Sequence, residues 1–174
     1  NAWQTYPPVT LPPADFSLSI PEQSVIGNKI SKEWEILTIK ALERQVQPYR
    51  VMLALDPNNT QAQMQIAVVF ARNGLYAQAT TELENIRTKD PVNIAALNNL
   101  GNIHYMQKDF LKARDMYLQA SEVDPNNADI KVNIAMVNYK LGDATKAKVV
   151  FDQATKLDDQ VPARYEQLAF LLAQ

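Results

Sequence analysis

Residues that carry chemistry are few in this sequence and lie far apart. There is one histidine, His104, and there is no cysteine, which excludes a thiolate zinc site, a disulfide and a cysteine nucleophile. Asp158 and Asp159 are adjacent carboxylates, but neighbouring residues of a helix point to different sides, so they do not form a general acid–base pair. The four glycines do not form a phosphate-binding loop. We therefore expect no catalytic residue, no metal and no cofactor, and we predict that the protein is not an enzyme.

The composition bounds the partners that the chain can take. Hydrophobic residues make up 47% of the 174 residues, which is enough for a continuous core, and the net charge is only −2. Without a basic patch, we expect no binding of nucleic acid. No apolar run approaches the ~18 residues of a membrane span, so we expect no direct membrane insertion. The N-terminus lacks a signal peptide and begins at Asn1, so we expect a fragment or a processed form, and the sequence predicts no compartment.

An Asp-Pro dipeptide recurs every 34 residues and gives the sequence an internal period. It occurs at 56–57, 90–91 and 124–125, and one period later the aspartate is kept as Asp158. A column of small residues and a column of bulky residues keep the same period. These columns are Ala67, Gly101, Ala135 and Ala169, and Leu83, Tyr117 and Phe151. A fixed period of this size is typical of stacked supersecondary units.

Each period contains two predicted helices. Residues 94–106 and 110–122 both carry apolar residues at three- and four-residue spacing. At the equivalent joints of the other periods, Gly74 and Gly142 favour the left-handed turn that ends a helix. The Asp-Pro dipeptide ends the second helix, because proline disfavours helical geometry in the residue before it. We expect the small column to lie where two helices approach closely, with the bulky column filling the gap beside it.

These columns resemble the tetratricopeptide repeat family. The residues that match its pattern at the expected spacings are Leu97, Leu100, Gly101, Ala113, Tyr117, Ala120 and Pro125. The resemblance implies an all-α fold, a right-handed helical-repeat solenoid of antiparallel helix pairs. It covers 60–161 as three repeats, and 162–174 is predicted as one further helix, either a cap or a truncated fourth repeat. His104 shares a column with Phe70, Asn138 and Leu172, so we expect a packed histidine.

The N-terminal part has a different composition. Residues 1–30 contain paired prolines and are predicted to be an extended segment, either a linker or a segment whose apolar side chains are docked on the helices. Residues 31–59 contain either a short first repeat or one long helix kinked at Pro48. The long helix is favoured, because nothing near Lys40 could make the turn between two helices.

The resemblance also implies where a partner binds. In this family the first helix of each repeat lines a concave groove that takes extended or helical segments of other polypeptides. The groove residues carried over in this way are Met64, Gln65, Val68, Arg72, Asn98, Asn99, Asn102, Tyr105, Met106, Val132, Asn133, Met136, Tyr139, Lys140, Glu166 and Phe170. The resemblance thus implies a protein–protein interaction module with a largely apolar, peptide-binding groove.

Some members of the family hold the terminal carboxylate of a peptide with lysine, arginine and asparagine at set places. Met64 and Val68 stand at the first two of these places in this sequence. Val132 and Met136 replace the later cations, so we expect no such clamp. An amide ladder at 34-residue spacing offers both donors and acceptors to a peptide backbone, or satisfies the fold itself. It consists of Gln65, Asn99, Asn133 and Gln167.

A second function remains open beside partner binding. The chain is alternatively a structural or oligomerising domain of a larger protein, with its groove filled by its own chain or by a second copy. Self-association would then use the N-terminal segment or the helix 31–55. A change of mass with protein concentration distinguishes this alternative from a monomeric adaptor.

Overall fold

The computed structural model describes residues 25–173, and over that range the chain contains helices and no strand. The chain forms two units, residues 1–41 and 42–174, and each is described here by itself. Most of the predicted extended segment 1–30 lies outside the described residues. Its last part differs from the prediction, because residues 25–30 already belong to a helix.

The first helix is α1, Val25–Leu55, and it crosses from the first unit into the second. Of the two alternatives for residues 31–59, the structure therefore has one long helix and not a short first repeat. Pro48 lies inside this helix, which continues for seven residues beyond it to Leu55. In the second unit, Val46 is almost completely buried, whereas Val51 and Leu55 are exposed on the same helix.

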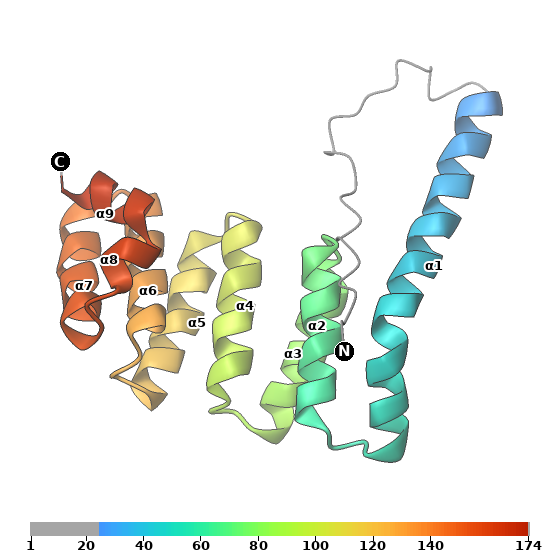
Figure 1. Ribbon diagram of the computed structural model, residues 1–174, viewed down its shortest axis with the longest axis horizontal. Helices are drawn as coiled ribbons and strands as arrows, with labels where there is room; N and C mark the ends of the chain where they lie inside the picture. The colour runs from blue at the N-terminus through green and yellow to red at the C-terminus, as the bar shows by residue number, and fades with distance from the viewer. Residues whose placement is uncertain (1–24, 174) are drawn as a thin grey trace, which may run out of the picture. The chain divides into compact units, whose positions relative to one another are not determined.

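Three helix pairs follow α1 within the second unit, and each pair consists of a 13-residue helix and a 14-residue helix. Consecutive helices pack against one another in sequence order (Figure 1). The pairs are repeat one, α2 Thr60–Arg72 and α3 Tyr76–Lys89; repeat two, α4 Ile94–Met106 and α5 Phe110–Val123; and repeat three, α6 Ala128–Lys140 and α7 Ala144–Leu157. The predicted helix-pair period is confirmed.

The turn inside each pair requires a left-handed residue. Gly74 and Gly142 have φ values of 74° and 86°, which confirms the role expected of these glycines. In repeat two the same place is taken by Lys108, with a φ of 62°. This conformation costs a residue with a Cβ about 1–2 kcal/mol, so repeat two carries local backbone strain that its neighbours lack.

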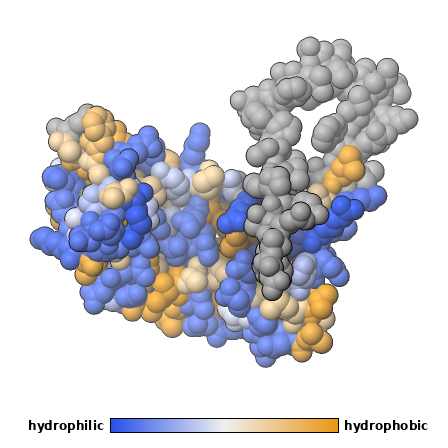
Figure 2. All heavy atoms as spheres, in the orientation of Figure 1, coloured by the Kyte–Doolittle hydropathy of each residue, from blue (hydrophilic) through white to orange (hydrophobic). Residues whose placement is uncertain are grey.

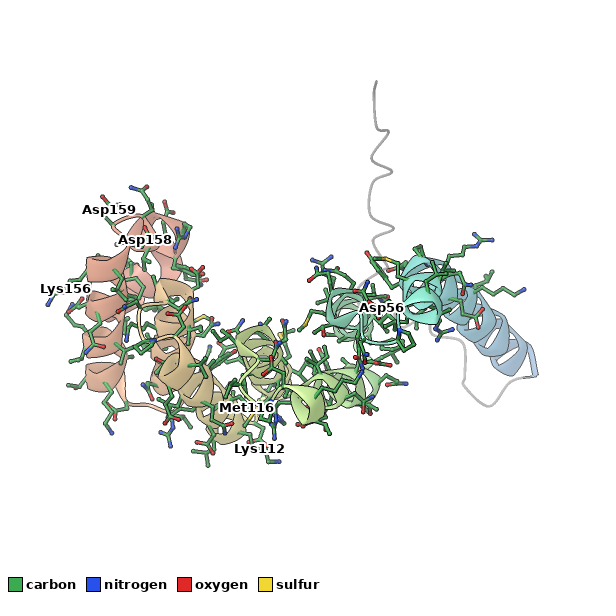
Figure 3. The ribbon with its side chains drawn as sticks, turned by 90° about the horizontal axis from the view of Figure 1, so that it is seen from below. Asp56, Lys112, Met116, Lys156, Asp158 and Asp159 are labelled. Atoms are coloured by element: carbon green, nitrogen blue, oxygen red, sulfur yellow. The ribbon has the colours of Figure 1, made fainter. Side chains whose placement is uncertain are left out.

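Aspartate organises the turn between successive repeats. The Oδ1 atom of Asp56 accepts a hydrogen bond from the Asn58 amide at 3.0 Å, and Oδ1 of Asp158 accepts one from the Gln160 amide at 2.9 Å. The turn at Asp158 therefore forms without a following proline (Figure 3). The recurring aspartate stabilises this turn through a side-chain-to-backbone bond, which is common for aspartate in turns.

Side-chain caps begin most of the helices in the repeats. The first helices share an asparagine cap at 34-residue spacing: the caps are Asn59, Asn93 and Asn127. The second helices of repeats two and three begin at Asp109 and Asp143, whose Oδ1 atoms accept from the Lys112 and Lys146 amides. The Lys112 ammonium and amide hold the pKa of the Asp109 carboxyl below its usual range, and the Lys146 amide and ammonium do the same for Asp143.

The core follows the two predicted columns. Gly101 is fully enclosed against the ring of Tyr117, and a Cβ built at Gly101 would meet Cδ1 of Tyr117 at 2.6 Å. The same meeting of a small and a bulky residue occurs in the other repeats, where Ala67 packs in one cluster with Leu83, and Ala135 with Phe151. The predicted close approach of the helices at the small column is therefore confirmed.

The C-terminal part differs from the predicted single helix 162–174. It forms two short helices, α8 Val161–Arg164 and α9 Glu166–Leu172, which are separated at Tyr165. Both residues at this break are bonded to one carboxylate on α6: Arg164 Nη2 and the Tyr165 hydroxyl each lie 3.1 Å from Asp129 Oδ1. Arg164 Nη1 also pairs with Asp158 at 2.8 Å. The two contacts with Asp129 join residues 35 and 36 positions apart, so no local sequence signal predicts them.

Candidate functional site

Two cavities open on the side of the molecule formed by the first helices of the repeats. Residues at equivalent places line both of them. Val68 and Asn102 line the first cavity, and Met136, one period further on, lines the second. Because equivalent residues of stacked repeats share a face, the two cavities lie on the same face of the repeat stack.

The first cavity, called the repeat 1–2 cavity, lies between repeats one and two and has a volume of about 430 Å³. Its lining is mostly aliphatic, with one cation and two amides at its edge. The lining residues are Ala67, Val68, Ala71, Arg72, Tyr76, Leu83, Asn99, Asn102, Ile103 and Met106. Figure 2 shows hydrophobic side chains in the hollow between α4 and α2.

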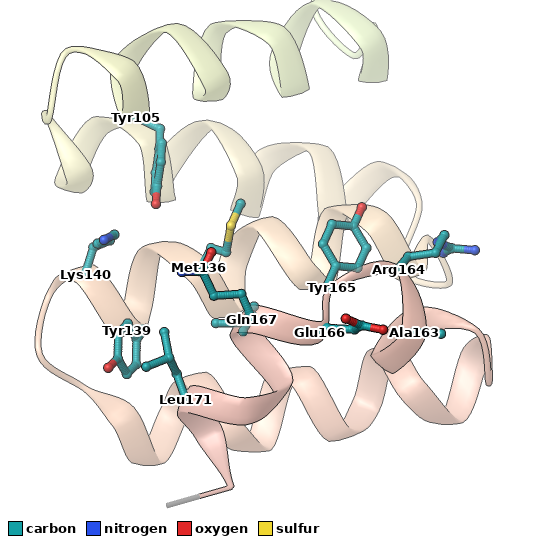
Figure 4. Close-up of a pocket in the computed structure, with 11 residues that line it drawn as sticks. Tyr105, Met136, Tyr139, Lys140, Ala163, Arg164, Tyr165, Glu166, Gln167 and Leu171 are labelled. Atoms are coloured by element: carbon teal, nitrogen blue, oxygen red, sulfur yellow. The ribbon is translucent and has the colours of Figure 1, made fainter.

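The second cavity, called the repeat 3 cavity, has a volume of about 480 Å³ and is lined by α4, α6 and the two C-terminal helices. Tyr105 projects from α4 toward Met136 and Lys140 of α6 (Figure 4). The ring of Tyr105 is held edge-on against Phe110, with centroids 5.4 Å apart. Lys140, Arg164 and Glu166 are the charged residues of its lining, and Arg164 is already paired with Asp129 and Asp158. Lys140 and Glu166 then bring opposite charges, so this cavity has no single charge preference.

Amide side chains form hydrogen bonds between neighbouring repeats, but the sequence separation of the bonded residues differs from that of the predicted ladder. Asn133 Nδ2 donates to Asn98 Oδ1 at 2.8 Å, and Asn99 Nδ2 donates to the Met64 sulfur at 3.2 Å. Both contacts join residues 35 positions apart, whereas the sequence repeats every 34. Some donors and acceptors of these amides are thus used in hydrogen bonds between repeats. Binding of a peptide backbone through the ladder stays a prediction.

Asn102 is polarised by a buried tyrosine. The Tyr117 hydroxyl donates to Asn102 Oδ1 at 2.7 Å, while the side chain of Asn102 itself is exposed. Burial of Tyr117 raises the pKa of its hydroxyl well above the ordinary value, so the hydroxyl stays a donor. With its oxygen engaged by Tyr117, Asn102 presents its NH₂ group at the cavity edge.

Two predicted groove residues are buried and cannot contact a partner. Val132 is 0% exposed and packs with Phe151, and Met64 is 8% exposed and packs with Leu83. Both side chains point between helices, which shields them from the surface. Phe170, another predicted groove residue, is 67% exposed but lines neither of the two cavities.

The other predicted residues remain accessible. Ten of them divide equally between the two cavities: Val68, Arg72, Asn99, Asn102 and Met106 line the first, and Tyr105, Met136, Tyr139, Lys140 and Glu166 line the second. Gln65, Asn98 and Asn133 are half-buried and line neither of them. The structure therefore brings most of the predicted groove residues together in two separate places.

Some lining residues were missed from the sequence. Tyr76 begins a second helix, and the prediction considered only first helices. Arg164, Tyr165 and Leu171 line the repeat 3 cavity because the C-terminal part breaks into two short helices. The start of a second helix beside the turn is a signal that could have identified Tyr76. The break at Tyr165 has no such signal.

Among the side chains that the structure describes, no group of three or more histidine, cysteine, aspartate or glutamate residues could hold a metal ion. His104 is half-buried on α4. No helix in this range is long and apolar enough to cross a membrane.

The helix pairs and their stacking define a helical-repeat solenoid. Two adjacent segments match models of the tetratricopeptide repeat, residues 94–127 and residues 128–161. These segments are repeats two and three of the structure. Residues 94–161 are therefore two tetratricopeptide repeats, the family that the sequence predicted. Such repeat scaffolds generally bind other proteins and are generally not enzymes. No curated protein matches the chain in sequence.

Solved structures share the fold of this chain. The crystal structure of MamA matches with a TM-score of 0.63 and 18% identity, covering 84% of this chain and 82% of MamA. TTC0263, a thermophilic tetratricopeptide repeat protein of Thermus thermophilus, matches with a TM-score of 0.65 and 17% identity, covering 83% of this chain and 81% of that one. At these identities the likeness shows the fold alone.

Proposed function

We propose that this protein binds a segment of another polypeptide across the face that carries the two cavities. The observation that supports this proposal is the pair of cavities on one face, each with apolar walls and polar groups at the edge. Cavities of a few hundred Å³ with a few placed polar groups are typical of binding sites. Each can take a large side chain of the partner while the polar edge contacts its main chain.

Aromatic and methionine side chains are the anchors of the proposed site. Tyr105 and Tyr139 supply large, partly buried rings, and residues of this type often contribute most of the binding energy. Met106 and Met136 are flexible enough to adapt to partners of different shape. The amides of Asn99 and Asn102 line the repeat 1–2 cavity together with Met106 and suit hydrogen bonding to a peptide backbone.

A binding experiment with displayed random peptides tests the proposal. Peptides selected on the purified chain are expected to lose at least about 1 kcal/mol of affinity with Tyr139→Ala. Leu118→Ala is the matched control, because Leu118 is exposed on α5 and lines neither cavity. Peptides that bind Tyr139→Ala and Met106→Ala as tightly as the parent would place binding elsewhere and contradict the proposal.

Exposed apolar residues on α1 favour the second candidate, self-association. Val51, Met52 and Leu55 are 50%, 41% and 83% exposed, although all three are apolar. Exposed apolar residues that gather on one element often mark an interaction site. The expected result is that the mass of the wild-type protein in solution rises with protein concentration. A double variant, Val51→Glu with Leu55→Glu, should keep the mass of a monomer at every concentration, which would support a role of this surface in oligomerisation.

A further inference from the structure

We infer that the repeat 1–2 cavity selects a partner segment that carries a bulky apolar side chain next to an acidic residue. The inference rests on the proposed function, and it names the chemistry of the partner. Three features of the cavity lead to it: its charge, the orientation of its amides and its apolar walls.

The charge of the cavity is one-sided. Neither α2 nor α4 contains an aspartate or a glutamate, and Arg72 is an exposed cation at the cavity edge. Among the described residues, no carboxylate lies within 4.0 Å of Arg72. A carboxylate of the partner would therefore meet a guanidinium with free donors.

The carboxylates of α3 and of the turn between α4 and α5 have partners of their own. Glu82 of α3 accepts a hydrogen bond from Gln63, nine residues before Arg72, which corresponds to about 13 Å along the helix. Asp109 is paired with Lys112 at 2.9 Å. These contacts leave Arg72 as the charge that decides which partner side chain is attracted.

The two amides of the cavity are oriented by their own neighbours. Asn102 has its oxygen bonded to Tyr117, so it presents a donor, and Asn99 donates to Met64, so it presents an acceptor. They lie three residues apart on α4 and therefore on neighbouring turns of one face. A donor and an acceptor at this spacing suit the carbonyl and the amide of an extended main chain.

The walls of the cavity require an apolar side chain. Val68, Ala71 and Ile103 line it beside the aliphatic part of Arg72, and Tyr76 closes one side. A leucine or phenylalanine inserted here would bury its whole side chain, which contributes about 1.5–3 kcal/mol. With its main chain on the amides, the residue next to this anchor reaches Arg72.

The repeat 3 cavity supplies a matched comparison. Arg72 and Lys140 end α2 and α6 and stand two periods apart, and Met106 takes the same place on α4. Lys140 shares its lining with Glu166 and with Arg164, whose guanidinium is already paired with Asp129 and Asp158. The acidic preference is therefore assigned to the first cavity and not to the second.

A charge-swap experiment tests the inference. The probes are fluorescent short peptides with a central leucine followed by glutamate, glutamine or lysine. The wild-type chain is expected to bind the glutamate peptide about fivefold more tightly than the glutamine peptide, on the scale of an exposed ion pair. Arg72→Glu should reverse the order of the glutamate and lysine peptides, and Lys140→Glu should leave it unchanged. Salt should reduce the preference.

Two further variants locate the anchor. Met106→Glu places a carboxylate at the rim and should weaken the glutamate peptide while the lysine peptide gains; Met106 is 62% exposed, so folding should be unaffected. Ala71→Phe fills the cavity and should weaken all three peptides.

The outcomes separate this inference from the proposed function. Peptides that bind in a Tyr139-dependent manner but show the same charge order on wild type and Arg72→Glu would overturn the inference and leave the proposed function standing. Peptide binding that Met106→Glu does not alter would also overturn it. If no displayed peptide binds the chain at all, the proposed function fails together with the inference.

Discussion

Gly101 is the member of the small-residue column without a Cβ, and Tyr117 explains why. The ring of Tyr117 occupies the space that a side chain at Gly101 would need, with Cδ1 only 2.6 Å from the position of a Cβ. Gly101→Ala should therefore lower the free energy of unfolding by about 1–3 kcal/mol, as expected for overpacking, measured by urea denaturation.

A smaller side chain at position 117 should relieve this clash. In a Tyr117→Leu background, which imitates the pairing of Ala67 with Leu83 in repeat one, Gly101→Ala should cost much less. Equal costs in the two backgrounds would show that Tyr117 is not what excludes a side chain from position 101.

Asn102 is both a groove residue and a partner of the core. Asn102→Ala should lower the free energy of unfolding by about 1–3 kcal/mol, because it leaves the buried Tyr117 hydroxyl without an acceptor. In the Tyr117→Phe background the same change should cost little. A double-mutant cycle measured by denaturation gives the coupling, and a coupling near zero would contradict the contact.

The packing of the small column against the bulky column could be predicted from the sequence, whereas the exposure of single residues and the contacts between other columns could not. The 34-residue period placed Gly101 opposite Tyr117 correctly. It did not show that Val132 is buried, because exposure depends on how far one helix is rotated against the next. It also did not show the bond between Asn98 and Asn133, which joins two different columns.

At the scale of the helix pair, the turn at Lys108 carries strain that the other turns avoid. Lys108→Gly should raise the free energy of unfolding by about 0.5–1 kcal/mol, because glycine adopts a positive φ without the Cβ penalty. Gly142→Ala is the matched control: nothing lies within 4 Å of a Cβ there, so backbone strain alone should destabilise the protein. A stable Gly142→Ala variant would show that these turns tolerate any residue.

The aspartate caps make the second helices sensitive to acid. The carboxyl of Asp143 has a lowered pKa in the folded chain because it accepts from the Lys146 amide and ammonium. It therefore stabilises the fold above the unfolded pKa of about 3.9, and this stabilisation is lost as the pH falls through the lowered value. Asp143→Asn keeps a capping acceptor, so its urea midpoint should lie below that of the parent at neutral pH and converge with it in acid. A difference that does not change with pH would contradict this linkage.

Helix boundaries could be predicted where they depend on residues close by in the sequence. Glycine, aspartate and proline marked the ends of the helices in the repeats. The C-terminal break at Tyr165 was not visible in the sequence, because it depends on Asp129, 36 residues earlier. The early start of α1 at Val25 was missed because the extended segment was drawn to residue 30, although its last proline is Pro21.

At the scale of the second unit, Asp129 attaches the C-terminal helices to repeat three. Asp129→Ala removes the bonds to Arg164 and Tyr165, so amide hydrogen exchange in α8 and α9 should accelerate by up to about fivefold, the scale of an exposed ion pair. Asp152→Ala is the control, since Asp152 pairs with Lys148 inside α7. Unchanged exchange in α8 and α9 would show that apolar packing alone holds them.

The fold was predictable to a greater extent than the site. Repetition averages out local uncertainty, since each column of the pattern is read several times along the chain. A binding site depends on the features in which repeats differ, such as Arg72, Met106 and Lys140 at one equivalent place. Those differences carry no periodic signal, so the division of the predicted groove into two cavities needed the structure.

Three side-chain contacts join residues 35 positions apart, and this spacing affects how repeats can be added to the gene during evolution. Met64 with Asn99, Asn98 with Asn133, and Asp129 with Arg164 each join one place in a repeat to the following place in the next. A single repeat thus encodes both halves of a head-to-tail junction, and such junctions build an open array wherever the rotation between units does not close a ring. Tandem duplication of one in-frame unit would create a new junction without any compensating mutation. Lengthening the array therefore needs no coordinated change, whereas altering one junction needs changes in two neighbouring copies.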